Sequence, residues 1–459
     1  MIKDDSDIRR AGEPAPDRRS PRPADGHAPY GWKPLAVLAA AGFIDRFEHQ
    51  LLPGVLPFIQ DEWDVGDTTA GLLPLGGALA AVTLTPLAGY LADRYRRVRI
   101  LAVIVLCWAV ATLASSLATG FAMFFVIRLL LASSEGFYGP LSGSLLADFY
   151  PPQSRAKAYG WRGLTPYLAS IGVIAGGVLG QHFGWRAAFV IAAIPGLIVA
   201  ALCMRLQEPP RGLLDRPAGA APGSPGAPAD EDGRVPEART GAARPGRGGH
   251  PRFRRQLRQV LGTPTLLLLS IALAALAFGL SGISYWTPTL IHRDHGVAEG
   301  LAASVSGAVT VIGVVAGVLA GTRLGRRWRR GGARLLVGGA GIVIGGVFLV
   351  AAISMPSLGA FAITLLLAKA TMATAIPNLT AAIADVLHAT TRGLGFAALH
   401  VCGAFGVAFG PLVVGVVSDA TGSVVSAMYG LSVPLLLGGL LTIAAHMTFD
   451  RDRSRPPAG

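Results

Sequence analysis

The chain has 459 residues, of which 52% are hydrophobic and 15% charged, and its mean hydropathy is +0.51. Soluble globular proteins are less apolar than this, so the composition excludes that class and indicates a membrane protein. The net charge of +13 would suit a nucleic-acid-binding protein. The basic residues are spread between apolar stretches, however, so no nucleic-acid partner is expected.

Apolar stretches recur along the chain, and a stretch of about 20 residues is enough to cross a bilayer as a helix. Backbone groups in lipid must be bonded within the segment, which favours helices over open strands. We therefore predict an all-α membrane protein with twelve transmembrane helices, at residues 33–59, 69–92, 99–119, 121–147, 156–181, 186–206, 264–290, 300–322, 334–354, 358–386, 393–418 and 424–447.

Basic residues are distributed unevenly among the loops between these helices. Of the 40 Lys and Arg residues, 34 fall in the tails and around the even-numbered loops, whereas Arg186 and Arg293 fall in odd-numbered loops. Cytoplasmic loops carry the excess of positive charge. Both termini are therefore expected in the cytoplasm, and the acidic first loop, residues 61–67, is expected outside. With no apolar signal sequence in the first thirty residues, we predict a multi-pass protein of the plasma (inner) membrane.

Metal, cofactor and nucleotide sites are not indicated by sequence motifs. The three cysteines, Cys107, Cys203 and Cys402, lie within predicted helices and lack metal-ligand spacing, so neither a disulfide framework nor a metal site is expected. No nucleotide-binding loop is recognisable, which disfavours a primary pump. No nucleophile stands at a recognisable spacing from an acid and a histidine, so we expect no enzyme and no cofactor.

Composition divides the chain into five parts. A Pro- and Arg-rich N-tail, residues 1–30, is predicted to be disordered. Two six-helix halves, residues 31–206 and 260–449, are separated by residues 207–259, where Pro, Gly, Ala and Arg dominate. Such a segment buries too little apolar surface to order itself, so we predict a flexible cytoplasmic linker. Residues 450–459 form a C-tail.

An internal repeat supports this division. A Pro, an Asp and an Arg in the first half recur in the second half with the same spacing between them: Pro140, Asp148 and Arg155, then Pro377, Asp385 and Arg392. The repeat predicts that the two halves share one architecture.

The first predicted helix carries four ionisable residues: Asp45, Arg46, Glu48 and His49. Ionisable groups at bilayer depth are costly and are functional candidates by default. Asp45, Glu48 and His49 share one helical face. A carboxylate beside an imidazole in a medium of low polarity suits proton transfer. The alternative is a structural charge cluster bonded to Arg46.

The fourth predicted helix carries Arg128 and Glu135 on one face, separated by about 10 Å along the axis. A guanidinium group binds carboxylate or phosphate through two parallel hydrogen bonds. Arg46 or Arg128 could therefore hold an anionic headgroup.

The second half is mostly apolar, with four exceptions. Tyr285 and Trp286 near a helix end are expected to be either membrane-interface anchors or substrate contacts. Lys369 is either a cation of the central cavity or a side chain that extends to the membrane surface. His400 is a further candidate for substrate binding or proton coupling. A charged first half opposite an apolar second half suits an amphiphilic solute.

Residues 89–97, after the second predicted helix, read Gly-Tyr-Leu-Ala-Asp-Arg-Tyr-Arg-Arg. This segment resembles the loop signature of the major facilitator superfamily, with Arg96 where that signature usually has Gly. The resemblance implies twelve helices in two halves, with a substrate site near the membrane midplane between them.

The same resemblance implies a cytoplasmic gate. Asp93 is expected to dock against the N-terminus of the eleventh helix, near Arg392, where the helix dipole favours negative charge. The implied gate residues are Gly89, Asp93, Arg94, Arg97, Asp148, Arg155, Asp385 and Arg392.

Several segments resemble the Spinster-like branch of this superfamily. They are Phe43-Ile-Asp-Arg46, Gly54-Val-Leu-Pro-Phe-Ile-Gln60, Gly184-Trp-Arg186 and Gly410-Pro411 with Asp419, together with Arg128 and Glu135. The resemblance implies that Asp45, Arg46, Arg128 and Glu135 line the cavity. The chain departs from the branch at residues 134–136, which read Ser-Glu-Gly instead of Gly-Glu-Ala.

Two other branches share features with the chain. Organic-anion symporters also carry Asp-Arg in the first helix and an Arg-to-Glu spacing in the fourth. Drug/proton antiporters have a glycine signature in the fifth helix, which Gly163, Gly172, Gly176 and Gly180 follow in part; Gly177 and Gln181 depart from it. Glycines at helical spacing also simply allow close helix packing.

The leading functional hypothesis is a secondary transporter of an amphiphilic, anionic, lysolipid-like solute, coupled to protons and working as a monomer by alternating access. The alternatives are a small organic-anion/proton symporter, a drug/proton antiporter, and a non-transporting membrane receptor with the same fold.

Overall fold

The computed structural model describes residues 30–151, 154–155, 158–159, 165, 168–210, 262–328, 332–387 and 392–454. The described regular structure is helical throughout. In chain order the helices are α1 (Lys33–Trp63), α2 (Asp67–Arg94), α3 (Arg97–Ser116), α4 (Phe121–Phe149), α6 (Ile171–Phe183), α7 (Trp185–Met204), α9 (Pro264–His295), α10 (Glu299–Arg327), α11 (Ala333–Ile353), α12 (Leu358–Ala373), α13 (Ala375–Val386), α14 (Arg392–Thr421), α15 (Val424–Gly430) and α16 (Ser432–Arg453).

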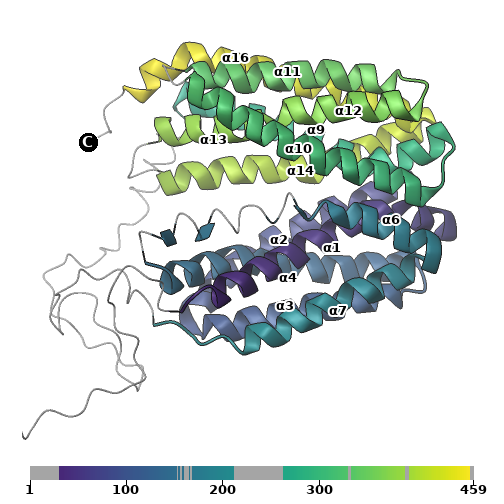
Figure 1. Ribbon diagram of the computed structural model, residues 1–459, viewed down its shortest axis with the longest axis vertical. Coiled ribbons are helices and arrows are strands. Elements are labelled where there is room, and N and C mark those ends of the chain that lie inside the picture. The colour runs from purple at the N-terminus through teal and green to yellow at the C-terminus, as the bar shows by residue number, and fades with distance from the viewer. Residues whose placement is uncertain are drawn as a thin grey trace, which may run out of the picture.

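The helices form two groups (Figure 1). The N-half contains α1 to α7, and α3 packs against α4 and α7. The C-half contains α9 to α16, and α11 packs against α12 and α16. Among the described residues, ten helical segments are long and apolar enough to cross a membrane. The all-α fold predicted from hydropathy is confirmed.

The halves meet along two helix pairs, α2 with α14 and α6 with α10. Glycine makes both contacts close. A Cβ atom on Gly71 of α2 would lie 2.8 Å from the Pro411 carbonyl oxygen of α14, and one on Gly177 of α6 would collide with Ala303 of α10. Small residues allow helices in membranes to approach in this way. The glycines of α6 therefore serve helix packing, as the second interpretation of their spacing predicted.

Two predicted helices are interrupted. Residues 358–386 form α12 and α13, divided at Thr374, and residues 424–447 form α15 and the start of α16, divided at Leu431. Pro377 and Pro434 each lack the N–H that would bond to the last residue of the preceding helix, four positions back. Prolines inside α1, α7, α9 and α14 do not end those helices, so the surrounding packing also contributes to the breaks.

Several predicted boundaries shift. Asp61 and Glu62, expected in a loop, belong to the last turn of α1, and Asp67 is the first residue of α2. The fifth predicted helix is described as a regular helix only from Ile171, as α6. Most of the predicted linker lies outside the described residues, but residues 207–210 are described.

The molecule has two opposite ends. The Asp67 end contains the α1–α2, α6–α7 and α9–α10 connections. The Arg97 end contains the α2–α3 connection and residues 207–210.

Candidate functional site

A buried ion pair joins α1 to α4 in the N-half. Glu48 accepts a hydrogen bond of 2.8 Å from the Arg128 guanidinium, and the two side chains are only 5% and 7% exposed. The Arg128 guanidinium also lies 5.8 Å from the ring centroid of Phe189 in α7. The sequence placed both charges at membrane depth but did not pair them. Arg128 is therefore already neutralised, which weakens the prediction that it holds a substrate anion.

Three further ionisable residues of α1, Asp45, Arg46 and His49, contact one another. Asp45 is 2% exposed and its carboxylate lies 2.9 Å from the Arg46 guanidinium, whereas the Arg46 side chain is 47% exposed. The Nδ1 atom of His49 lies 3.4 Å from the Asp45 backbone oxygen. The buried Asp45 carboxylate is thus paired with a half-exposed Arg46 side chain.

Lys369 of α12 is buried within the C-half at 1% exposure, and its ammonium donates a hydrogen bond to the Thr310 hydroxyl of α10. The Thr310 hydroxyl in turn donates to the Ser306 carbonyl. The prediction that Lys369 extends to the membrane surface is therefore wrong, because Thr310 holds the side chain inside the bundle. A buried ammonium remains as a candidate anion contact.

Tyr285 and Trp286 of α9 are buried, at 6% and 0% exposure. The Tyr285 hydroxyl donates to the Ala70 carbonyl of α2, and the Trp286 indole donates to the Pro411 carbonyl of α14, each at 2.8 Å. The interpretation as membrane-interface anchors is therefore wrong. These side chains instead tie α9 to α14 and to the N-half, using their polar atoms as well as their rings.

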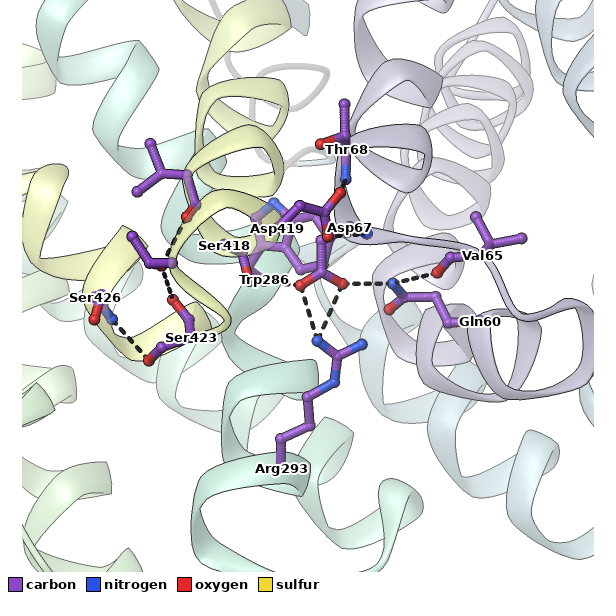
Figure 2. Close-up of polar contacts among 12 residues, drawn as sticks. Gln60, Val65, Asp67, Thr68, Trp286, Arg293, Ser418, Asp419, Ser423 and Ser426 are labelled. Atoms are coloured by element: carbon purple, nitrogen blue, oxygen red, sulfur yellow. Dashed lines mark hydrogen bonds and ion pairs between the residues drawn. The ribbon is translucent and has the colours of Figure 1, made fainter.

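A polar cluster at the Asp67 end joins the two halves (Figure 2). The Asp67 carboxylate accepts hydrogen bonds from Gln60 at 2.7 Å, from Arg293 at 2.9 and 3.0 Å, and from Ser418 at 2.6 Å. In the other direction, the Asp419 carboxylate accepts hydrogen bonds from the first two backbone N–H groups of α2. A helix N-terminus favours negative charge, so α14 caps α2 across the boundary between the halves.

A second ion pair at this end lies within the N-half. The Glu62 carboxylate accepts hydrogen bonds from the Trp185 indole at 2.7 Å and from Arg186 at 2.8 Å. The Arg186 guanidinium also lies 4.2 Å from the Trp185 ring centroid. Burial raises the pKa of Glu62, but the hydrogen bonds from Trp185 and Arg186 outweigh it and hold that pKa below its ordinary value. Arg186 and Arg293, the two basic residues of odd-numbered loops, thus both neutralise acids of residues 61–67.

At the Arg97 end, Arg97 is nearly buried between two acids. Its guanidinium forms ion pairs with Asp148 of α4 at 2.5 Å and with Glu208 at 3.3 Å. Glu208 also accepts hydrogen bonds from the backbone N–H groups of Arg97 and Val98, which begin α3. Glu208, among the first residues of the predicted linker, therefore caps a helix, and the flexible linker over 207–259 stays a prediction.

The C-half repeats one of these contacts. Arg334 near the start of α11 pairs with Asp385 of α13 at 3.1 Å. Arg334 and Asp385 are separated along the chain by the same interval as Arg97 and Asp148, and both pairs follow the offset of the sequence repeat. The repeated acids thus share a structural partner, an arginine in the first turn of α3 in one half and of α11 in the other.

The other gate candidates have more local contacts. Arg155 donates to the backbone carbonyls of Ala147 and Tyr150, which satisfies the C-terminal end of α4. Arg94 is exposed and donates to the Tyr90 hydroxyl one helical turn earlier, at 3.0 Å. Five further candidates lie on helices, but their side-chain contacts are outside what the structure describes: Gly89, Asp93, Glu135, Arg392 and His400.

Sequence reasoning missed Arg334, Glu208 and the role of Asp67. Arg334 could have been found by extending the repeat, since it stands in the second half where Arg97 stands in the first. Asp67 and Arg293 carried weaker signals, as an acid and a rare base in opposite outer loops. Glu208 carried none, because its partners are 110 and 111 residues away in sequence.

The helical fold and the charges buried within it define a multi-pass membrane protein. The sequence model of the Major Facilitator Superfamily matches residues 38–355, more than half of the chain. The protein belongs to this superfamily.

Within the superfamily the chain resembles Spinster proteins. It is 26% identical over 270 residues to human protein spinster homolog 1, covering 57% of this chain and 46% of that protein. It is also 29% identical over 195 residues to the hexuronate transporter of Bacillus subtilis, covering 42% of this chain and 46% of that one. The chain thus spans about half the length of the curated relatives it matches.

A solved structure shares the whole fold. The crystal structure of a bacterial homolog of the human lysosomal transporter Spinster, inward-facing and unoccupied, matches with a TM-score of 0.78. The match covers 94% of this chain and 100% of that one, at 23% identity.

Proposed function

We propose that this protein is a secondary transporter that carries an amphiphilic organic anion across a plasma membrane by alternating access, with protons as the coupling ion. The observation that supports this most strongly is the set of ionisable side chains buried at membrane depth in a superfamily fold: Asp45, Glu48, Arg128 and Lys369. Burying such groups is costly, and a receptor or scaffold of the same fold would gain nothing from that cost.

The solute would be held by cations from both halves. Arg46 is the leading contact for a carboxylate or phosphate, because its half-exposed guanidinium offers several donors in a planar fork. Lys369 supplies a second, buried positive charge in the mostly apolar C-half. A charged headgroup with an apolar tail matches this division, and it favours a lysolipid-like anion over a small hydrophilic acid.

Proton coupling is assigned to Asp45, with Glu135 as the second candidate. Asp45 is buried beside the Arg46 guanidinium, so protonation of this acid would release Arg46 to a substrate anion. Substrate binding and proton binding would then depend on each other at one pair of side chains. His49, whose Nδ1 atom lies 3.4 Å from the Asp45 backbone oxygen, would relay the proton.

The direction of opening follows from two observations. The excess of Lys and Arg supports a cytoplasmic position for the Arg97 end and for both termini. A group of hydrogen bonds joins the two halves near the Asp67 end, from Tyr285–Ala70 to Gly300–Gln181. These contacts support an inward-open state closed at the outer, Asp67 end, with Asp93 and Arg94 belonging to the cytoplasmic gate that closes in the opposite state.

A second candidate is a symporter of small organic anions. The 29% identity to a hexuronate transporter favours it. The two candidates differ in whether the solute needs an apolar tail.

Transport in proteoliposomes distinguishes the candidates. Uptake and counterflow of a lysophospholipid and of a hexuronate would be measured with and without a proton gradient. We expect gradient-driven uptake of the lysophospholipid, lost in Asp45→Asn or Glu135→Gln while counterflow persists, and loss of both activities in Arg46→Ala. Arg451→Ala, at an exposed end of α16, is the control. Gradient-driven uptake that survives in both acid variants would reject the coupling assignment.

Topology is tested separately by thiol labelling in intact cells. A cysteine placed within residues 211–261 should resist a membrane-impermeant reagent, whereas one placed at Asp64 should react. The reverse pattern would invert the proposed orientation.

A further inference from the structure

Three potential metal ligands meet at the Asp67 end. Asp61 comes from the last turn of α1, His292 from the last turn of α9 and Glu299 from the first residue of α10. One ligand atom from each side chain lies within 4.8 Å of the other two. Asp61 belongs to the N-half and the other two residues to the C-half, so the cluster spans the boundary between the halves.

The connection between α9 and α10 holds His292 and Glu299 together. Gly296 ends α9 in the left-handed region, at φ +64°, and its N–H bonds to the His292 carbonyl. Glycine adopts this conformation without steric cost. The sharp turn brings the start of α10 back beside the last turn of α9, which places Glu299 next to His292 without any help from the N-half.

The same turn sets the orientation of the histidine ring. The Nδ1 atom of His292 lies 2.8 Å from the Val297 carbonyl oxygen, which can only accept a hydrogen bond. Nδ1 therefore carries the proton in the neutral ring, and Nε2 presents its lone pair. That Nε2 atom lies 3.7 Å from the Glu299 carboxylate. Metal-binding histidines are typically oriented in this way, by a carbonyl bonded to the second ring nitrogen.

The spacing and chemistry fit a small divalent ion. Ligand atoms about 2.1 Å from a tetrahedral zinc lie roughly 3.4 Å from one another. The contact between His292 and Glu299 is near this value, and a ligand atom of Asp61, exposed at a helix end, lies within 4.8 Å of both. The neighbouring Arg293 does not oppose a cation there, because Asp67 already neutralises it.

We propose that Asp61, His292 and Glu299 bind a divalent transition-metal ion, with zinc as the best fit, and that the ion links the N-half to the C-half. One imidazole with two carboxylates is a ligand set that suits zinc, and a water molecule would complete four ligands. The expectation of no metal site rested on local spacing, which cannot reveal ligands that come from opposite halves of the chain. The bound ion holds the Asp67 end closed. Binding requires the fold but not the proposed transport activity.

Binding is tested on the purified full-length protein in nanodiscs, stripped with a chelator and titrated with zinc chloride by calorimetry. We expect one site per chain. His292→Ala, Asp61→Asn and Glu299→Gln should each weaken it about tenfold or more. His182→Ala is the matched control, since His182 is exposed at the end of α6 at the same end of the molecule. Equal melting temperatures without zinc would show that the variants are folded.

The link between halves is tested by measuring spin-label distances across the Asp67 end. Zinc should narrow the distance distribution in the unsubstituted protein and in His182→Ala, but not in Asp61→Asn. Zinc affinity equal in the unsubstituted protein and in a variant that combines Asp61→Asn, His292→Ala and Glu299→Gln would overturn the site, as would tighter binding of magnesium than of zinc. Full affinity in Asp61→Asn would overturn the link. All these readouts are independent of transport, so failure of the proposed function would leave them unaffected.

Discussion

The buried pair of Glu48 and Arg128 should make a large, non-additive contribution to stability. Their side chains are 5% and 7% exposed. Truncating either partner therefore leaves a charge without its counter-ion in the protein interior, and such a loss costs about 3–5 kcal/mol. Arg128→Met and Glu48→Gln should each approach this cost. The double variant removes both charges, so we expect it to regain about 2–3 kcal/mol relative to the sum of the single variants.

The assay is a double-variant cycle on the free energy of unfolding, measured in mixed micelles with increasing denaturing detergent. The chain offers a matched control in the Glu62–Arg186 pair, whose side chains are about 40% exposed. Exposed pairs contribute roughly 0–1 kcal/mol, so Arg186→Met should have a small effect. Additive costs in the Glu48–Arg128 cycle, or equal costs for the buried and exposed pairs, would refute the argument that burial makes this pair important.

Other contacts predict distinct phenotypes. Asp67→Asn removes the ionic part of the contact with Arg293, which is 42% exposed. A loss of about 1 kcal/mol should shift the equilibrium roughly fivefold toward molecules open at the Asp67 end. Unchanged spin-label distances at that end would contradict this. Lys369→Met keeps the side-chain volume and removes a buried charge bonded only to Thr310 among described residues. We expect a higher melting temperature but weaker binding of the substrate anion. Unaltered binding would exclude Lys369 from the substrate site. Glu208→Ala removes the cap of α3. The free energy of unfolding should fall by about 1 kcal/mol. No change in that free energy would show that Glu208 contributes nothing to stability.

Helix positions and the membrane class were predictable because both depend on local composition. An apolar stretch of sufficient length must be helical in lipid whatever packs against it. The interruptions at Pro377 and Pro434 were less predictable. Proline permits a break, but α1 continues through Pro53 and Pro57, so the neighbouring helices decide whether a proline ends a helix.

The residue types of the candidate site were predictable, but which side chains pair with one another was not. Asp45, Glu48 and Arg128 attract attention in sequence because charges inside apolar stretches are costly. Only the fold pairs Glu48 with Arg128, and this leaves Arg46 as the more accessible cation. The orientation of the Lys369 side chain was equally unpredictable, because it depends on the Thr310 hydroxyl 59 residues away.

By itself, the sequence determined the membrane class, the repeat between the halves and which charges fall inside apolar stretches, because hydropathy and spacing are properties of neighbouring residues. The tertiary structure alone decided which charges meet. Asp67 pairs with Arg293 across 226 residues, and Asp61 meets His292 and Glu299 from the other half. Such contacts depend on how whole helices pack, and close packing is set by shape and glycine content along both partners. A single stretch of sequence does not contain that information.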